Sequence, residues 1–489
     1  MQPSTARDNV LNRLPLIGRE NELSLLTSAL REAEEGSGRT VFLSGEGGIG
    51  KTRVAAAAAE WAEQEGWNVV LGRAYAVETG IPYALFSDAL LPSLKKMESS
   101  TLAVLTRGSA SELAYLFPAL ATTGNRESAA AGIDPSDLKA RILWNFSQFL
   151  GRYSAKQPLC LILENLQWAD ASSLELFHFV ARQITGQRIA LIATYNDTEG
   201  DTNSVLRTTE QSLVRLGVAT KCRLDPLSQA EVAEMLEVVF GVDAASIRPF
   251  TALLYGWTRG NPFFVEETLK SLIEAGALEC IDGRWTGWEV EALKLPATIR
   301  DAVAGRLERL SSHAREVANL AAVIGRSVTF DRLHAVSSLG QDQLATALDE
   351  LVAQRILEER DSAAGARYDF AHPILQQVTY AALGGARARL LHATVGEALE
   401  LFYGPRATEH AGELALHFSR AHTFAPKAVR YLSEAGRAAL MTYANREAAS
   451  HLSSALEQIE AGGDDVPERD EIIRNLARAR QRLGDYDGA

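Results

Sequence analysis

Cysteine is scarce in this sequence, which contains three cysteines in 489 residues. They stand at Cys160, Cys222 and Cys280, and no two of them form a CxxC pair. Disulfide-stapled folds and cysteine-based zinc sites need paired or clustered cysteines, so neither class is expected here. We interpret all three as small buried hydrophobic side chains in a protein of the reducing cytosol.

Long apolar runs are also missing. A membrane-spanning helix needs about eighteen or more consecutive apolar residues, and no such run occurs in the sequence. The N-terminal residues MQPSTARDNVLNRLPLIGRE contain no apolar core of the kind that a secretion signal requires. We therefore expect a cytoplasmic protein without a membrane partner.

The chain lacks an excess of positive charge. Its 49 lysines and arginines face 62 aspartates and glutamates, which gives a net charge of −13. Domains that bind nucleic acid carry a basic surface, so this balance argues against DNA contact by these residues. Arg306 and Arg309 form a small basic cluster, but their helical spacing among acidic residues predicts that both lie on a solvated surface.

What the sequence does contain is an alternation of strands and helices over residues 14–222. Apolar strands that alternate with helices form a parallel sheet covered by helices on both faces, so an α/β domain is predicted. The expected strands are RTVFLSG at 39–45, NVVLGRAY at 68–75, PLCLILEN at 158–165 and RIALIATYN at 188–196. The residues before this domain, 1–13, are expected to be flexible.

Beyond about residue 223 the strand pattern disappears and helices take over. We predict a helical domain at 223–294, a winged-helix domain at 295–387 and helical repeats at 388–489. The winged-helix prediction rests on ILEERDSAAGARYDF, two strand-like runs around a glycine-containing turn that follow several short amphipathic helices.

The C-terminal residues carry a repeat signal. LGDYDGA resembles the end of the first helix and the turn of a tetratricopeptide repeat, and YANREAASHLSSALEQI resembles the second helix of an earlier one. Half a repeat leaves an apolar face unpaired, because each unit buries its face on a neighbour. We therefore expect the natural sequence to continue past Ala489.

A phosphate-binding motif is the most specific feature of the chain. GEGGIGKT at 45–52 fits GxxxxGK[ST], follows a strand and opens a helix, as a P-loop NTPase domain requires. Its main-chain N–H groups converge on phosphate oxygens, Lys51 reaches the β- and γ-phosphates, and the Thr52 hydroxyl binds Mg²⁺. We therefore predict ATP or ADP with Mg²⁺ as the ligand. The predicted nucleotide-binding residues here are Gly45, Glu46, Gly47, Gly48, Ile49, Gly50, Lys51, Thr52 and Arg53.

The stretch LILENLQWAD at 161–170 ends its apolar run on Glu164 and Asn165. Such a strand end lies across from the phosphate loop, so Glu164 is predicted to bind Mg²⁺ and, with Asn165, to form the catalytic pair. An asparagine can orient a water but cannot take its proton, and loss of a general base lowers the rate by about 10²–10⁴. Asp170 is expected to cap the next helix, and the alternative that Glu164 only ends a strand stays open.

Five stretches together resemble the STAND class (signal transduction ATPases with numerous domains), in the branch of large ATP-binding LuxR-type regulators. They are LIGRENEL, GEGGIGKT, LILENLQWADASSLEL, RGNPFFVEE and FAHPILQQVTY. The resemblance implies that Ile17, Gly18 and Arg19 lie near adenine, that Pro262 contacts the base, and that His372 reaches the phosphates of a resting ADP form. On structural grounds alone, Pro262 starts a helix and His372 is a capping or core histidine.

Two departures from the family pattern bear on activity. Glu164 and Asn165 replace the usual two aspartates, and the fourth strand ends in Asn196 where the family usually has an arginine. A positive charge there stabilises the transition state of phosphoryl transfer, so both departures predict slow or absent hydrolysis. Asp197 and Arg53 are close enough in sequence to compensate.

Three functions remain open at this stage. The first is an ATP/ADP-dependent signalling switch that self-associates with ATP, takes an inducer or a protein on its repeats, and contacts DNA only through a module absent from this chain. The second is a competent ATPase of the chaperone or machine type. The third is a nucleotide-stabilised scaffold that binds a partner without switching.

Overall fold

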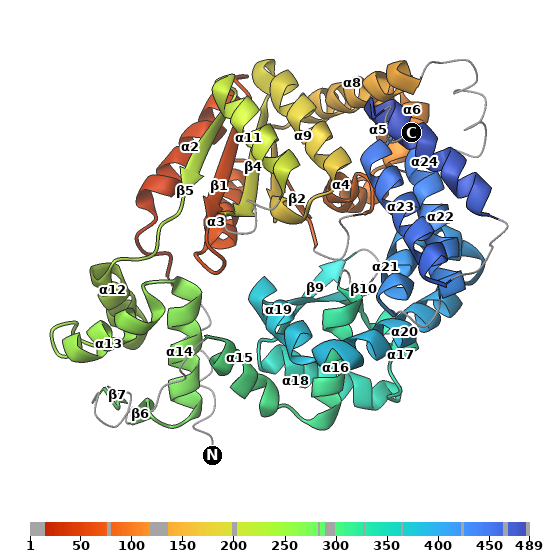
Figure 1. The fold of residues 1–489 in the computed structure, drawn as a ribbon. Coiled ribbons are helices and arrows are strands. Elements are labelled where there is room, and N and C mark those ends of the chain that lie inside the picture. The colour runs from red at the N-terminus through yellow and green to blue at the C-terminus, as the bar shows by residue number, and fades with distance from the viewer. Residues whose placement is uncertain are drawn as a thin grey trace.

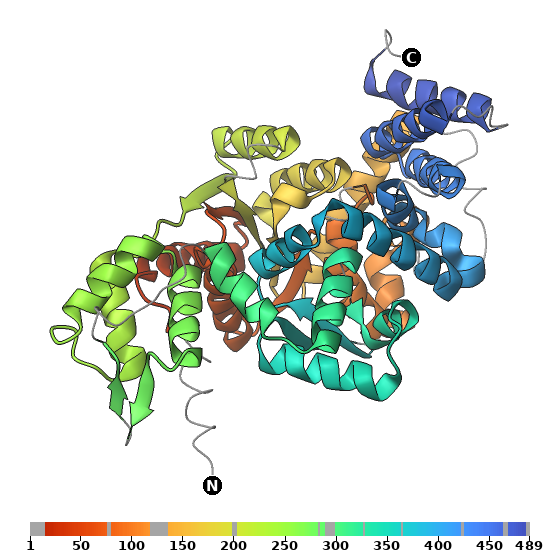
Figure 2. The same cartoon turned by 60° about the horizontal axis from the view of Figure 1, so that its bottom comes forward.

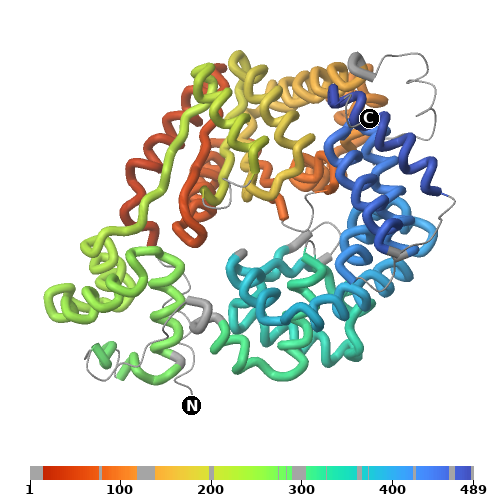
Figure 3. Tube along the Cα trace, viewed as in Figure 1, coloured from red at the N-terminus to blue at the C-terminus, as the bar shows by residue number. Residues whose placement is uncertain are grey.

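The computed structural model describes ten segments of the chain, and all structural statements below concern them. They are 15–75, 80–117, 135–197, 203–281, 284–288, 299–325, 328–362, 365–421, 425–462 and 468–485. Figures 1 and 3 show these segments arranged around a ring, with a sheet at one side and stacked helices at the other.

A five-stranded parallel sheet forms the first part of the ring, with strand order β2-β3-β4-β1-β5. Its strands are β1 (Arg39–Gly45), β2 (Asn68–Arg73), β3 (Leu159–Glu164), β4 (Ile189–Asn196) and β5 (Ala219–Arg223). Every residue of β3 is buried. The sequence predicted four of these strands, but β5 was missed because it is an edge strand whose side chains are mostly exposed.

Helices cover both faces of the sheet, as the strand composition predicted. One face packs against α2 (Glu20–Glu34) and α3 (Lys51–Gln64). The opposite face packs against α4 (Ala84–Lys96), α8 (Pro135–Ser154), α9 (Ala171–Gln183) and α11 (Ser204–Arg215), and beside them lie α5 (Ser99–Thr106) and α6 (Ala110–Leu116). Short 3₁₀ turns at η2 (Leu166–Trp168) and η3 (Ile184–Gly186) flank α9.

The start of α9 agrees with the sequence. Asp170 caps this helix as predicted, because its carboxylate accepts the Ser173 N–H. Helix α8 begins at Pro135, a residue whose fixed φ suits the first turn of a helix.

The next group contains α12 (Gln229–Phe240), α13 (Arg248–Thr258) and α14 (Pro262–Glu274). The prediction that strands disappear here is wrong, because β6 (Glu279–Ile281) and β7 (Arg284–Thr286) pair as a short antiparallel hairpin. The hairpin packs through aromatic contacts, with Trp285 5.0 Å from the ring centre of Phe240. Figure 2 shows this group projecting from the rest of the ring.

The following group combines helices with a three-stranded sheet of order β8-β10-β9. Its helices are α15 (Ile299–Glu308), α16 (Ser312–Ile324), α17 (Phe330–Val336), α18 (Gln341–Ala353) and α19 (Pro373–Ala382). Its strands are β8 (Val328–Thr329), β9 (Leu357–Ser362) and β10 (Gly365–Phe370). The antiparallel β9–β10 hairpin is the one that the sequence placed at 356–370.

Helices stack one on the next through the C-terminal part of the chain. They are α20 (Gly384–Tyr403), η5 (Gly404–His410), α21 (Ala411–Ala421), α22 (Ala425–Met441), α23 (Asn445–Gly462) and α24 (Arg469–Leu483). Among the described residues, no helix combines the length and apolar character that crossing a membrane requires. The structure thus confirms the predicted fold class, an α/β P-loop domain followed by a mostly helical region.

The three cysteines are free thiols. Cys160 on β3 is buried as predicted, whereas Cys222 on β5 and Cys280 on β6 are half-buried. The prediction failed for these two because both lie on short or edge strands, which expose one side to solvent.

Candidate nucleotide site

The phosphate loop, residues 45–52, connects β1 to α3. Gly45, Gly48 and Gly50 have positive φ values of 148°, 82° and 100°, conformations that side-chain-bearing residues rarely adopt. Ile49 is fully buried and anchors the loop in the core beneath the sheet. Lys51 folds back over the loop, where its Nζ donates to the carbonyls of Gly45 at 2.8 Å and Glu46 at 2.7 Å.

Thr52 and Arg53 follow in the first turn of α3, and both side chains are exposed. A Cβ placed on Gly50 would meet no atom within 4 Å, so open space adjoins the positive end of the helix. This loop fits a phosphate group: it offers main-chain N–H donors, a helix N-terminus and a lysine. The hydroxyl of Thr52 and the carboxylate of Glu164 are hard oxygen donors of the kind that suits Mg²⁺.

The segment before α14 lies directly on the phosphate loop. Asn261 Nδ2 donates to the Gly47 carbonyl at 3.0 Å, and the Phe263 N–H donates to the Gly48 carbonyl at 3.2 Å. Pro262 stands between them as the first residue of α14, as its structural interpretation predicted. A Cβ on Gly48 would lie 2.8 Å from the Phe263 Cβ, so only glycine allows this approach. The contact between Pro262 and a base stays a prediction.

The residues predicted near adenine join the phosphate loop to the helices that follow the sheet. Arg19 is 5% exposed, and its Nη2 donates to the carbonyls of Ile49 at 3.2 Å and Asp225 at 2.8 Å. Ile17 packs in the apolar cluster of α12, α13 and α14. Gly18 adopts φ 65° beside Glu231 of α12, where a Cβ would clash with the carboxylate.

His372 comes to the same place from the other end of the chain. Its ring stacks on Phe263, with centroids 4.1 Å apart, and its Nδ1 accepts the Ile374 N–H at 3.2 Å as the N-cap of α19. The capping interpretation is therefore confirmed. Burial lowers the pKa of His372 to about 3 against the opposing effect of Glu267. The neutral ring then carries its proton on Nε2, because Nδ1 accepts a hydrogen bond. The contact between His372 and a phosphate stays a prediction.

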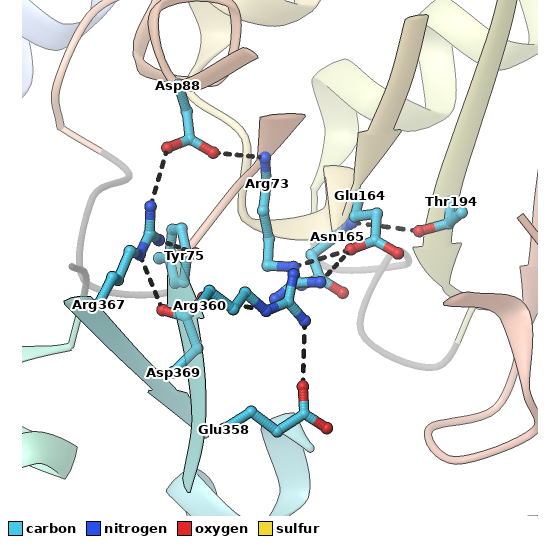
Figure 4. Close-up of polar contacts among 10 residues, drawn as sticks. All are labelled: Arg73, Tyr75, Asp88, Glu164, Asn165, Thr194, Glu358, Arg360, Arg367 and Asp369. Atoms are coloured by element: carbon cyan, nitrogen blue, oxygen red, sulfur yellow. Dashed lines mark hydrogen bonds and ion pairs between the residues drawn. The ribbon is translucent and has the colours of Figure 1, made fainter. Parts of the chain in front are cut away.

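Glu164 and Asn165 lie at the end of β3, where the Glu164 carboxylate is bound by an arginine. Glu164 is 2% exposed, and its Oε2 accepts both Nε and Nη2 of Arg73 at 2.8 and 2.6 Å. Asn165 adopts a left-handed conformation with φ 61°, and its N–H donates to Thr194 Oγ1 at 3.3 Å. Figure 4 shows this group. Sequence reasoning missed Arg73, which stands 91 residues from its partner.

Asn196 at the end of β4 is a second residue that sequence reasoning undervalued. Its Nδ2 lies 3.7 Å from the position of a Cβ on Gly47, and its N–H donates to Gln167 Oε1 at 3.0 Å. The Asn196 amide therefore faces the phosphate loop. The sequence analysis considered this position only as the place of a missing arginine. The sequence holds no local signal for this placement, because it follows from the direct pairing of β4 with β1. Asp197, considered as a compensating residue, pairs with Arg223 at 3.1 Å.

The prediction that Arg306 is solvated is wrong. Arg306 is 5% exposed, forms an ion pair with Glu267 of α14, and donates to the Gln354 carbonyl after α18. Through Arg306 the helix α15 is tied to the segment that carries Phe263. Arg309 is exposed, as predicted. Helical spacing alone could not separate the two residues, because a buried ion pair and a solvated charge leave the same pattern in sequence.

Comparison with known proteins finds a family match for the part of the chain that contains the parallel sheet and the phosphate loop. The AAA ATPase domain family matches residues 15–192. The matched residues include the phosphate loop, so this part of the chain is similar to P-loop ATPase domains of the AAA type. A curated but uncharacterized protein of Rhizobium meliloti (strain 1021) is 24% identical over 486 residues, which cover 91% of this chain. The chain spans 42% of the length of that relative.

Two solved structures resemble the chain over most of its length. A Signal Transduction ATPase with Numerous Domains (STAND) protein with a tetratricopeptide repeat sensor, from Pyrococcus horikoshii, matches with a TM-score of 0.45 and 13% identity. That match covers 97% of this chain and 62% of the other. The Aeropyrum pernix ORC2 protein matches with a TM-score of 0.35 and 16% identity, over 79% of this chain and 98% of the other.

Proposed function

We propose that the chain is the nucleotide-binding and sensor portion of a STAND-class switch, belonging to a LuxR-type transcriptional regulator, that binds ATP or ADP with Mg²⁺ and hydrolyses ATP slowly. The observation that carries the proposal is the convergence of three distant segments on the phosphate loop. Arg19 bonds to Ile49, the segment at Asn261 bonds to Gly47, and His372 stacks on the same segment.

In this proposal the nucleotide holds the closed ring together. Lys51 and the main-chain N–H groups of the loop bind the phosphates, and the Nε2–H of His372 adds a contact from the winged helix, 295–387. Moving a two-state switch from 1:99 to 99:1 requires a difference of about 5.5 kcal/mol in ligand binding between the states. Two or three charge-assisted hydrogen bonds made in one state only supply a difference of that order.

Slow hydrolysis follows from the groups at the end of β3. Glu164 is neutralised by Arg73, and Asn165 offers an amide where a general base is needed. Bound Mg²⁺ would offset the charge of the phosphates, with Thr52 and Glu164 as the residues that hold it. The remaining residues proposed for the site, among them Lys51 and His372, bind and position the nucleotide.

The helical repeats at 388–489 are proposed as the sensor. Stacked helix pairs present an extended surface for an inducer or a protein, and exchange of ADP for ATP would favour an open form that self-associates. Any contact with DNA would belong to a module outside these 489 residues. The net negative charge of the chain supports the proposal that these residues do not contact DNA themselves.

Nucleotide binding is tested with Lys51→Ala and a fluorescent ADP analogue. Loss of the lysine contacts is expected to weaken binding about tenfold to a hundredfold. Lys156→Ala, an exposed lysine in the turn before β3, is the control and should leave affinity unchanged. Equal affinity in Lys51→Ala and the parent would overturn the proposed site.

Hydrolysis and switching have separate tests. Asn165→Asp restores a carboxylate at a position whose left-handed backbone aspartate tolerates, and it is expected to raise phosphate release about tenfold or more. Parent turnover already equal to that of ordinary signalling ATPases would contradict the slow-hydrolysis proposal. Light scattering with ADP and with ATP separates a switch from a static scaffold, since only a switch changes its size.

A further inference from the structure

The charged residues at the ends of β2 and β3 form a group that connects the nucleotide site to the β9–β10 hairpin. Arg73 and Glu164 are directly paired in the register of the two parallel strands. Both guanidinium nitrogens that face the carboxylate bind the same oxygen, Oε2. The ion pair is shielded from water, because Glu164 is 2% exposed and the Arg73 side chain is 15% exposed. The charge of the carboxylate predicted to hold Mg²⁺ is thus already compensated.

Arg73 is held in place from the side of the hairpin as well. Its main-chain N–H donates to Asp88 Oδ2 at 2.9 Å, and the other oxygen of Asp88 lies 3.6 Å from Nη1 of Arg367 on β10. Arg367 also donates to the hydroxyl of Tyr75, two residues after Arg73. Figure 4 shows the chain of contacts running from Arg367 through Asp88 to Arg73 and Glu164.

A carboxylate on the hairpin completes the arrangement. Asp369 on β10 is 8% exposed and accepts Nε of Arg367 at 3.0 Å. Its other oxygen, Oδ2, lies 3.8 Å from Nε of Arg360 on β9, so Asp369 joins the two strands of the hairpin. The docked hairpin therefore binds Asp88 through Arg367, and Asp88 in turn binds the main chain of Arg73.

We propose that Arg73 is a positioning residue that holds Glu164 away from a nucleotide-bound divalent cation as long as the β9–β10 hairpin is docked, and that undocking of the hairpin releases the carboxylate to the cation. The inference rests on the proposed nucleotide-binding function. It gives the hairpin an effect on the site that is separate from the stacking of His372 on Phe263.

The physical basis is competition for one oxygen. A shielded, doubly hydrogen-bonded guanidinium competes strongly with a divalent cation for Oε2, because both partners are already stripped of water. When the hairpin leaves, the bridge from Arg367 through Asp88 to Arg73 is lost, and Arg73 becomes exposed. An exposed arginine–carboxylate pair contributes little, so the cation then displaces it.

The experiment measures Mn²⁺ binding to the ADP complex by electron paramagnetic resonance, which needs no turnover. Arg73→Gln is expected to tighten Mn²⁺ binding about fivefold or more, and Arg367→Gln, on the hairpin, is expected to act in the same direction more weakly. Adding Glu164→Gln to Arg73→Gln should abolish the gain. Arg39→Gln removes an exposed ion pair at the start of β1 and is the matched control, which should not change Mn²⁺ affinity.

A separate measurement of ADP affinity distinguishes failure of this inference from failure of the proposed function. ADP affinity in the presence of a metal chelator reports on nucleotide binding alone. If the parent binds no ADP, the proposed function fails and this inference fails with it. If ADP binds equally to the parent and the variants while Mn²⁺ affinity stays constant or falls in Arg73→Gln, the inference alone is overturned. Should Arg73→Gln not fold, Arg367→Gln decides, because its side chain is partly exposed.

Discussion

The carboxylate of Glu447 accepts two hydrogen bonds from Ser172, from the main-chain N–H at 3.0 Å and from the hydroxyl at 2.9 Å. Glu447 belongs to α23 and Ser172 to the first turn of α9, so this contact closes the ring between the C-terminal helices and the ATPase domain. Tyr83 and His451 support it, through hydrogen bonds to the carbonyls of Thr442 and Gly80.

Removal of this carboxylate is expected to open the ring. In Glu447→Ala the N-terminus of α9 loses a buried anion and two charge-assisted hydrogen bonds, each contributing about 1.5–3 kcal/mol. The docking equilibrium should therefore shift by about tenfold or more towards undocked repeats. Small-angle X-ray scattering would show a larger radius of gyration. Glu457→Ala, an exposed residue of the same helix, is the control, and an unchanged scattering curve for Glu447→Ala would contradict the prediction.

The same interface is expected to respond to pH. Burial, followed by the charge of Glu447, raises the pKa of Asp170 to about 7. A raised carboxyl pKa favours the docked form when protonated, so this contribution is complete below the ordinary pKa of about 4 and is lost as pH rises through 7. Scattering should show a more open protein at pH 8 than at pH 6. In Asp170→Asn, which stays neutral and still accepts a hydrogen bond at the cap, this difference should disappear.

Replacing two glycines of the phosphate loop is expected to distinguish the effect of backbone strain from that of a steric clash. Gly48 and Gly50 both have positive φ, but an added Cβ meets Phe263 at 2.8 Å in the first case and open space in the second. Gly50→Ala is expected to lower the stability of the nucleotide-free protein by strain alone, on the order of 1–3 kcal/mol. Gly48→Ala should lower it further, because α14 must move away. Thermal unfolding checks this, and equal melting temperatures would contradict it.

A buried histidine pair is expected to destabilise the helical region in acid. His392 Nδ1 and His417 Nδ1 lie 3.0 Å apart, and burial lowers the pKa of each to about 3. Histidines with a lowered pKa contribute stability above about pH 6.5 that is lost as pH falls, at up to about 1.4 kcal/mol per pH unit for each residue. Calorimetry at pH 7 and pH 5 should show a lower melting temperature in acid.

The matched variants for the histidine pair are His417→Gln and His313→Gln. His417→Gln removes one of the two groups that must take up a proton, so its acid-induced fall in melting temperature should be smaller. His313 is exposed, and its substitution should leave the fall unchanged. A parent protein whose melting temperature is the same at both pH values would rule out this role for the pair.

Much of the α/β domain could be predicted because its signals are local. The apolar runs of β1, β2, β3 and β4 mark buried strands, since a strand covered on both faces is hydrophobic throughout. The edge strand β5 and the β6–β7 hairpin escaped prediction, because exposed or very short strands leave no such run. Their place depends on neighbours, for example on Trp285 packing against Phe240.

By itself the sequence determined that the chain carries a phosphate loop from Gly45 to Thr52 and an amide at Asn165, because these features lie within a few consecutive residues. Tertiary structure alone decided that Arg73 compensates Glu164, that Asn196 faces Gly47, and that Arg306 is buried. The reason is that charge compensation and burial depend on which strands and helices become neighbours. Ion pairs between residues 91 positions apart, such as Arg73 and Glu164, leave no periodic trace in the chain.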